Sequence, residues 1–391
     1  VSGVERASAE ELKRTLGVKP GDPLDFKKLN LGVSRVFGSG YFERVNYSLL
    51  NDSGRNVLAI DAREKSWGPN YLRFGLSLNA DTVGEGRFNL LMRYLQTQFN
   101  GWGAEWRTDF QLGRDRRIAT QFFQPLGASG WLNQLSVAPG VEYLQRPVDF
   151  IIAGKRSFQY QLTSDIQALD FGVDLSRNAI LRLGISKSDN KAKPTIGTSI
   201  FAVPEFRDGG ARVKFLYDSL DDTSFPREGH LLQVDHYKTF DKFGADRRYS
   251  KTEVNIQEYM TFKAGTFSVA GRYGRSGNEG LNQFNNFTLG GFQQLSGYRP
   301  AEFTGSAVAL ARVGYLHRLA QVRNPFGSNL YLGTTLEVGR TAATTELLRL
   351  AENKASVSLY AGFETLFGPL YLGFGKSREK TPLFYLFLGQ P

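Results

Sequence analysis

The sequence has no cysteine among its 391 residues, which excludes disulfide bonds and thiolate metal sites. Histidine is also scarce, because only His230, His236 and His317 occur, and they do not form a cluster in the sequence. A metal centre needs several ligands at one place. The sequence therefore predicts no metal site and no cofactor.

Long hydrophobic runs are absent as well. No stretch of about 18 or more apolar residues occurs, so no transmembrane helix is predicted. The hydrophobic content of 41% and the mean hydropathy of −0.31 are ordinary, whereas 43 glycines and 13% aromatic residues are unusual for an enzyme. A transmembrane β-barrel is compatible with these values because its strands alternate lipid-facing apolar and lumen-facing polar side chains.

Blocks of like charge are missing, although the net charge is +10. Lysine and arginine are interspersed with aspartate and glutamate, which is not typical of a nucleic-acid-binding surface. We interpret the positive charge as serving the lumen of a barrel and acidic lipid headgroups, and nucleic acid is not predicted as a partner.

A catalytic signature is lacking too. The sequence contains no G-x-S-x-G nucleophile elbow, because residues 127–130 (GASG) and 274–277 (GRSG) do not have its spacing. The paired carboxylates Asp221 and Asp222 lie in a predicted turn and are expected to be solvated. The chain is therefore predicted not to be an enzyme, with no catalytic residues.

Residues 1–68 predict a small α/β domain. Ser8 and Glu11 have capping-box spacing at the start of one helix, and a second helix follows. Strands are predicted at residues 42–50 and 57–62, joined by a turn-rich Asn-Asp-Ser-Gly segment. A short strand at the start of the chain completes the order β-α-α-β-β.

From Tyr71 onward, apolar and polar residues alternate with a period of two. About sixteen candidate strands follow, separated alternately by short turns and longer links, as in a barrel whose two ends face different compartments. A soluble two-sheet sandwich fits less well, because so many evenly spaced strands would require several sandwiches. Residues 69–391 are predicted to form an all-β transmembrane barrel of about sixteen antiparallel strands.

One stretch, residues 288–305 (TLGGFQQLSGYRPAEFTG), does not follow the alternation. It is rich in glycine, which permits backbone conformations that other residues resist. It also carries large apolar side chains, which can anchor a long loop. We expect a loop with a fixed position rather than a mobile surface loop.

The segment Gly40-Tyr41-Phe42-Glu43-Arg44-Val45 resembles the G-x-F-x-x-V pattern of POTRA domains, and the resemblance covers residues 1–68. An unrelated small α/β domain is the alternative. The resemblance implies a periplasmic domain that contacts extended polypeptide by strand addition at an open sheet edge. It places passenger binding on the strand that carries Phe42, Val45 and Tyr47.

Further motifs resemble the BamA-type superfamily of outer-membrane transporters and insertases, in the right order and spacing. Asp218, Pro226 and Gly229 match the family's D-x-x-x-x-x-x-x-P-x-x-G hairpin at a periplasmic turn. Residues 383–391 (LFYLFLGQP) are similar to the final strand that such barrels present to the assembly machinery, although the terminal phenylalanine is missing.

The glycine-rich stretch resembles the family's sixth extracellular loop, whose V-R-G-F/Y tip folds into the barrel lumen. The matching residues are Leu295, Ser296, Gly297 and Tyr298. The resemblance implies a lumenal loop at residues 275–303.

In the family, the arginine of this loop pairs with an aspartate on strand thirteen. Here Ser296 replaces the arginine, and Glu337 replaces the aspartate. Arg299 is expected to supply the cation to Glu337, with a solvent-facing Arg299 as the alternative. Tyr298 and Phe303 are expected to pack against the inner wall.

The resemblance implies protein transport. One POTRA domain followed by a sixteen-stranded barrel is similar to the translocator half of the patatin-like autotransporters of type Vd secretion. These export a covalently linked N-terminal lipase passenger, and this chain would be the part left after its removal. A two-partner secretion transporter or an outer-membrane protein insertase, acting on a separate client, is the alternative. A barrel enzyme is a third and less favoured possibility.

The resemblance also implies a location in the bacterial outer membrane, with the POTRA domain in the periplasm. The expected partners are a polypeptide passenger, outer-membrane lipid and lipopolysaccharide, and the barrel assembly machinery during biogenesis. The sequence does not decide between a monomer and a homodimer. Translocation is expected to use the lumen and a weak seam between residues 71–79 and 383–389.

Overall fold

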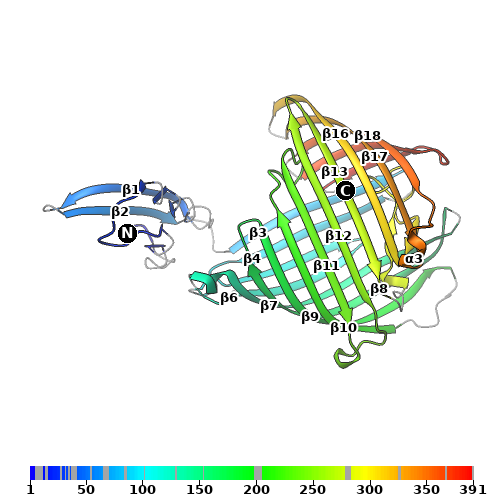
Figure 1. Ribbon diagram of the computed structural model, residues 1–391, viewed down its shortest axis with the longest axis horizontal. Helices are drawn as coiled ribbons and strands as arrows, with labels where there is room; N and C mark the ends of the chain where they lie inside the picture. The colour runs from blue at the N-terminus through cyan, green and yellow to red at the C-terminus, as the bar shows by residue number, and fades with distance from the viewer. Residues whose placement is uncertain are drawn as a thin grey trace. The chain divides into compact units, whose positions relative to one another are not determined.

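The structure is a computed structural model, in which most of the chain can be described (Figure 1). The described residues are 1–4, 12–13, 16–26, 29–30, 32–33, 36, 42–52, 55–64, 70–82, 86–100, 102–127, 130–152, 154–197, 205–277, 283–324, 327–365 and 368–389. Within these ranges, no helix is both long and apolar enough to cross a bilayer.

The N-terminal domain contains two antiparallel strands, β1 (Phe42–Asp52) and β2 (Arg55–Glu64). Ser2 forms a parallel bridge with Asp61 on β2: the Ser2 N–H donates to the Ile60 carbonyl, and the Ser2 carbonyl accepts from the Ala62 N–H. The carbonyl of Ile60 and the N–H of Ala62 therefore point away from β1. In the described part of this domain, β1 pairs only with β2 and forms the sheet edge.

The core of this domain combines buried apolar side chains from helical residues with others from β1 and β2. The buried members are Leu12, Leu16, Leu29, Val36, Phe42, Ile60 and Ala62. The predicted α+β domain is confirmed by this arrangement. The capping residues Ser8 and Glu11, and Gly40 and Tyr41 of the motif, lie outside the described residues.

The rest of the described chain forms a closed antiparallel barrel of sixteen strands, which confirms the predicted fold class (Figure 1). The strands are β3 (Asn70–Asp81), β4 (Gly86–Gln96), β5 (Glu105–Gly113), β6 (Arg116–Pro125), β7 (Leu135–Ile152), β8 (Lys155–Asp174), β9 (Ala179–Ile196), β10 (Glu205–Asp218), β11 (Gly229–Thr239), β12 (Ser250–Phe262), β13 (Gly265–Ser276), β16 (Ala307–Asn324), β17 (Gly327–Ala342), β18 (Lys354–Thr365), β19 (Gly368–Ser377) and β20 (Leu383–Leu388).

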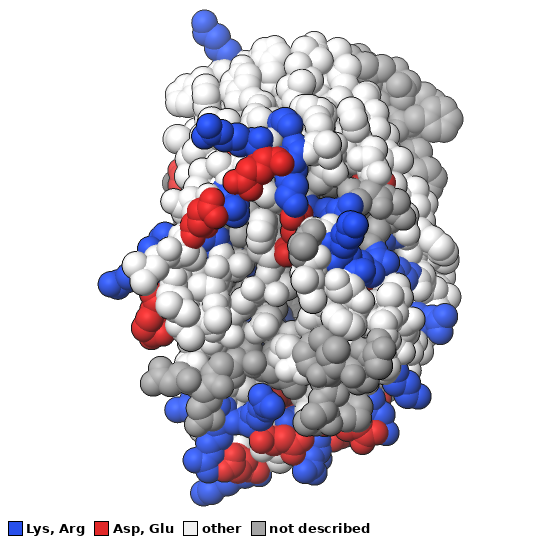
Figure 2. Space-filling view, turned by 90° about the vertical axis from the view of Figure 1, so that its right-hand side faces the viewer, with Lys and Arg blue, Asp and Glu red and all other residues white. Residues whose placement is uncertain are grey.

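Alternation decides which side chains face the lumen. Along β20, Leu383, Tyr385 and Phe387 are buried, whereas Phe384 and Leu386 are exposed on the outer wall. Charges of both signs are interspersed, as Figure 2 shows for the face that it presents, where small groups of basic and acidic side chains lie between uncharged areas.

The expected irregular loop has a short ladder at its base. Between β13 and β16, the strands β14 (Phe287–Leu289) and β15 (Phe303–Gly305) pair with each other, after a 3-10 turn at Gln283–Asn285. The ladder brings the two ends of the segment at residues 290–302 together. A short helix, α3 (Thr345–Leu348), lies in the link between β17 and β18.

Candidate functional site

The tip of the loop is pressed directly onto the barrel wall. A Cβ atom on Gly297 would lie 2.2 Å from the Ser377 backbone nitrogen, and one on Gly375 would lie 1.9 Å from the Ser296 carbonyl oxygen. Only glycine allows two backbones to approach this closely. Leu295 holds a φ of 77°, a left-handed conformation that is unusual for a residue with a side chain, and its side chain is fully buried. Packing therefore holds the tip in a fixed conformation.

The loop is locked by one carboxylate. Glu337, only 1% exposed, accepts hydrogen bonds from the Ser296 N–H at 2.5 Å and the Ser296 hydroxyl at 2.7 Å. It also accepts from the hydroxyls of Thr335 at 2.6 Å and Ser356 at 2.8 Å. Four donors thus satisfy both carboxylate oxygens without a cation.

The predicted ion pair between Arg299 and Glu337 is wrong. The backbone N–H of Arg299 donates to Glu302 at 2.9 Å, and within the described residues its guanidinium has no hydrogen-bond or ion-pair partner. The physical reason is the small size of Ser296, which lets the loop backbone reach the carboxylate and donate to it directly. Ser296, which the sequence placed at the family's arginine position, is itself the partner of Glu337.

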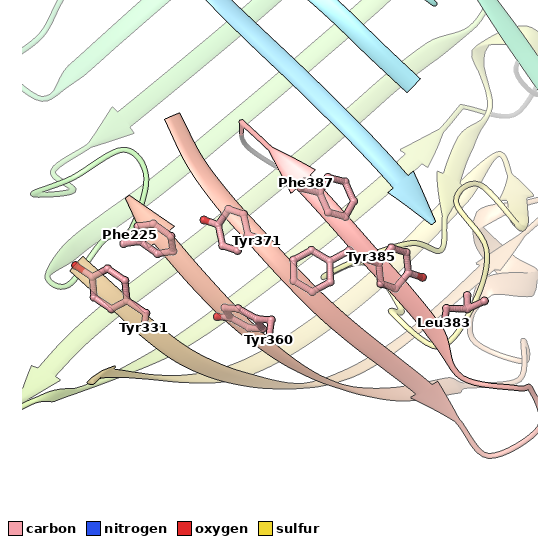
Figure 3. Packing of buried hydrophobic residues seen from close by; sticks show 8 residues of the cluster. Phe225, Tyr331, Tyr360, Tyr371, Leu383, Tyr385 and Phe387 are labelled. Carbon is pink, nitrogen blue, oxygen red and sulfur yellow. The ribbon is translucent and has the colours of Figure 1, made fainter. Parts of the chain in front are cut away.

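The loop also enters an aromatic cluster on the lumenal side of β18, β19 and β20 (Figure 3). The ring of Phe292 contacts the rings of Tyr360, Tyr371, Tyr385 and Phe387, with centroids 5.3 to 6.0 Å apart. The Tyr385 hydroxyl lies 2.8 Å from the carbonyl oxygen of Ser296. The last strand is therefore tied to the loop by both apolar and polar contacts.

Tyr298 and Phe303 pack on each other and against neighbouring strands. Their ring centroids are 5.0 Å apart, and Tyr298 belongs to a buried cluster with Tyr249 and Val308. Both residues thus take part in anchoring the loop in the barrel.

A second anchor lies at the start of the loop and was missed from the sequence. Phe284 is buried among Phe150, Tyr160 and Phe206, which come from β7, β8 and β10. Asn285 beside it donates to Asp208 at 3.0 Å. The loop therefore contacts two separate parts of the barrel wall. A phenylalanine within the polar stretch NQFNN was the signal that could have identified this anchor.

The predicted periplasmic turn, residues 219–228, is ordered by its own carboxylates. Asp218 accepts from the Leu220 N–H at 3.0 Å, and Asp221 accepts from the N–H groups of Arg227 and Glu228. Asp221 and Asp222 are exposed, as expected, but they also cap backbone groups of the turn. Gly229 has a φ of 108°, which favours glycine where β11 begins.

This turn reaches the same aromatic cluster as the loop. Phe225, next to Pro226, stacks on Tyr331 with centroids 4.5 Å apart, and the Tyr371 hydroxyl donates to the Ser224 carbonyl at 2.9 Å (Figure 3). The loop and the turn enter from opposite ends of the barrel, because an odd number of strand passages separates them. The cluster therefore connects both ends of the barrel to β20.

The junction between the first and last strands is short. In the described residues, only four pairs join β20 to β3, from Tyr385↔Asp81 to Leu388↔Leu78. Six pairs join β19 to β20, and thirteen join β9 to β10. The seam thus lies at residues 78–81 and 385–388, slightly displaced from the expected ranges.

The residues predicted to bind the passenger face the interior of their own domain. Phe42 is 4% exposed, and Val45 and Tyr47 are partly buried against the same core. Their side chains therefore contribute to the core of this domain. The outer main-chain groups of β1 remain the feature that strand addition would use.

Comparisons with known proteins agree with this architecture. The Omp85 superfamily domain model matches residues 98–362, and a POTRA model described as a surface antigen variable number repeat matches residues 1–65. No curated protein sequence matches the chain.

Three solved structures have a similar fold. BamA from Haemophilus ducreyi lacking POTRA domains 1–3 has a TM-score of 0.76 at 14% identity, covering 99% of this chain and 83% of that one. CdiB from Acinetobacter baumannii has a TM-score of 0.63 at 12% identity, with coverages of 98% and 72%. CdiB from Escherichia coli has a TM-score of 0.62 at 13% identity, with coverages of 98% and 74%. At these identities the similarity shows the fold alone.

Proposed function

The chain belongs to the Omp85 superfamily, and on this premise we propose that it exports a covalently linked, N-terminal patatin-like lipase passenger, as in type Vd secretion. An Omp85 transporter barrel is a non-enzymatic kind of protein, and the combination with a POTRA domain is consistent with an outer-membrane protein. The proposal adds that the POTRA domain lies in the periplasm and receives the passenger there. Its support is the POTRA match that directly precedes the barrel.

The short seam is the observation that carries a translocation mechanism. Four residue pairs hold β20 to β3, so fewer ladder hydrogen bonds must break there than between β9 and β10. The lumen beside the seam is occupied by the locked loop, whose Phe292 contacts Phe387 on β20. Release of the loop and opening of the seam would therefore be coupled through β20.

A disulfide across the seam tests this mechanism. Ala80 and Leu386 are directly paired, and the chain has no other cysteine, so Ala80→Cys with Leu386→Cys gives a specific cross-link. We expect oxidation to stop passenger export in cells and reduction to restore it. The matched control is Ala361→Cys with Leu372→Cys, a paired position between β18 and β19. Undiminished export from the oxidised seam variant would refute seam opening.

A second candidate function is transport or insertion of a separate client. The open edge of β1 favours it equally, because strand addition accepts any extended polypeptide. Deletion of residues 1–68 distinguishes the two functions. A separate protein retained in the periplasm would support this second candidate, whereas retention of the fused passenger alone would support the type Vd proposal.

A further inference from the structure

We propose that the rim of the barrel beside the seam binds a phosphorylated glycolipid of the outer leaflet, with a phosphate in a cationic pocket and an acyl chain in an apolar groove. This site goes beyond the proposed function, because it does not depend on which polypeptide the barrel transports. It would place a lipid across the junction between β3, β20 and the locked loop.

The cationic pocket has a volume of about 430 Å³ and lies at the end of the barrel where β3 ends. The first residue of β8 contributes Lys155, the loop contributes Arg299, and the turn between β19 and β20 contributes Lys380. Such a pocket is within the size range of roughly 300–1,000 Å³ that ligand sites show. Three cations from three separate segments thus converge on one cavity.

Within the described residues, acidic side chains do not balance the charge of this pocket. Glu302 is its one lining carboxylate among the described residues, and it already accepts from Lys380 at 3.0 Å and from the Arg299 N–H at 2.9 Å. Neither the Lys155 ammonium nor the Arg299 guanidinium has a partner within the described part of the chain. The pocket therefore offers two free cations, which suits a phosphate group with its several acceptor oxygens.

An apolar groove of about 540 Å³ lies next to this pocket, and Thr82 lines both. Its apolar wall includes residues whose exposed side chains belong to the outer face of the barrel, namely Leu332, Leu359, Leu372, Phe384 and Leu386. Asp81, the carboxylate at its edge, interacts electrostatically with Arg87.

The position of the groove decides the occupant. Its lining continues the lipid-facing surface, because the outward residues of β18, β19 and β20 lie in register with one another. An apolar surface at this position is covered by acyl chains, whereas a soluble phosphate compound could fill only the cationic pocket. A lipid that carries its phosphate at the membrane rim satisfies both features at once.

Native mass spectrometry of the purified full chain in detergent tests the site, with diphosphorylated lipid A as the probe. We expect Lys155→Gln combined with Arg299→Gln to weaken retention of lipid A by roughly tenfold or more, because charge-assisted hydrogen bonds are lost. The control Lys193→Gln with Arg349→Gln makes the same charge change at exposed side chains outside the pocket. Equal retention by the wild type and the pocket variant would overturn the proposal, as would equal loss in the control.

The groove is tested separately by filling it. Leu359→Trp should reduce lipid A retention, whereas Ile256→Trp, at an equally exposed position on β12, should not. Fully dephosphorylated lipid A should bind poorly to the wild type. If it binds as well as the phosphorylated form, or if millimolar inorganic phosphate displaces lipid A completely, the combined site is refuted. These measurements do not involve a passenger, so they can fail while the proposed transport function stands.

Discussion

At the scale of single residues, the lock replaces an expected ion pair with neutral donors. Burying a carboxylate without hydrogen-bond partners costs free energy, whereas a carboxylate surrounded by hydroxyl and N–H donors is satisfied. The family resemblance placed Ser296 and Glu337 at the positions of the paired arginine and aspartate, but the contact with Glu337 was assigned to Arg299, whereas Ser296 makes it. That error follows from assuming that a carboxylate needs a charge, which the hydroxyls of Thr335 and Ser356 make unnecessary.

Glu337→Ala tests the lock. The substitution leaves the N–H and hydroxyl of Ser296 and two neighbouring hydroxyls without their acceptor, and we expect it to destabilise the docked loop by about 2–4 kcal/mol. Limited proteolysis from outside the cell should then cleave the loop. Arg299→Ala should leave the loop protected and should add nothing to Glu337→Ala, because the guanidinium does not contact the lock. Cleavage of Arg299→Ala to the same extent as Glu337→Ala would contradict this assignment.

At the scale of elements, the period of two and the turn residues predicted the strands, but not where every strand ends or every short ladder. The sixteen strands were predictable because lipid-facing and lumen-facing residues alternate along each of them. The continuation of β9 to Ile196 was not, because polar residues such as Asn190 pair across the ladder there without an apolar alternation. The ladder between β14 and β15 was not predictable either, because strands of three residues are too short to show a period of two.

The open edge of β1 gives a prediction at this scale. Val45 and Tyr47 pair with Ala62 and Ile60, whose main-chain groups point toward Ser2 and away from β1. Hydrogen-bonded and non-hydrogen-bonded pairs alternate along an antiparallel ladder, so the N–H of Leu49, two residues after Tyr47, also points away from β2 and faces the open edge. Its side chain is exposed, so Leu49→Pro removes one edge donor without creating a core cavity. We expect Leu49→Pro to impair passenger export in cells while the barrel still assembles. Leu49→Ala is the control and should export normally; equal export from both variants would exclude strand addition at this edge.

At the scale of the barrel, the structure shows a loop fixed at two places on the wall and a turn that enters from the other end. None of this follows from the sequence of any single strand, because the contacting aromatic residues are far apart in the chain. Phe225 and Tyr371 illustrate the point, since 146 residues separate two rings whose centroids are 5.1 Å apart. The closed topology brings them together, and no local pattern specifies it.

The two anchors of the loop should control whether the lumen conducts. Phe284 holds the start of the loop among residues of β7, β8 and β10, and Phe292 holds its tip beside β18 to β20. Replacing either phenylalanine by alanine removes a buried side chain at a cost of about 3–5 kcal/mol, which the remaining anchor can still offset in part. We therefore expect Phe284→Ala and Phe292→Ala to conduct poorly in planar bilayers. The double variant should show frequent large openings, because neither end of the loop is then fixed. Phe267→Ala, an exposed aromatic position on the outer wall, is the control. A double variant that conducts no more than the two single variants would mean that the base ladder and Glu337 alone hold the loop in place.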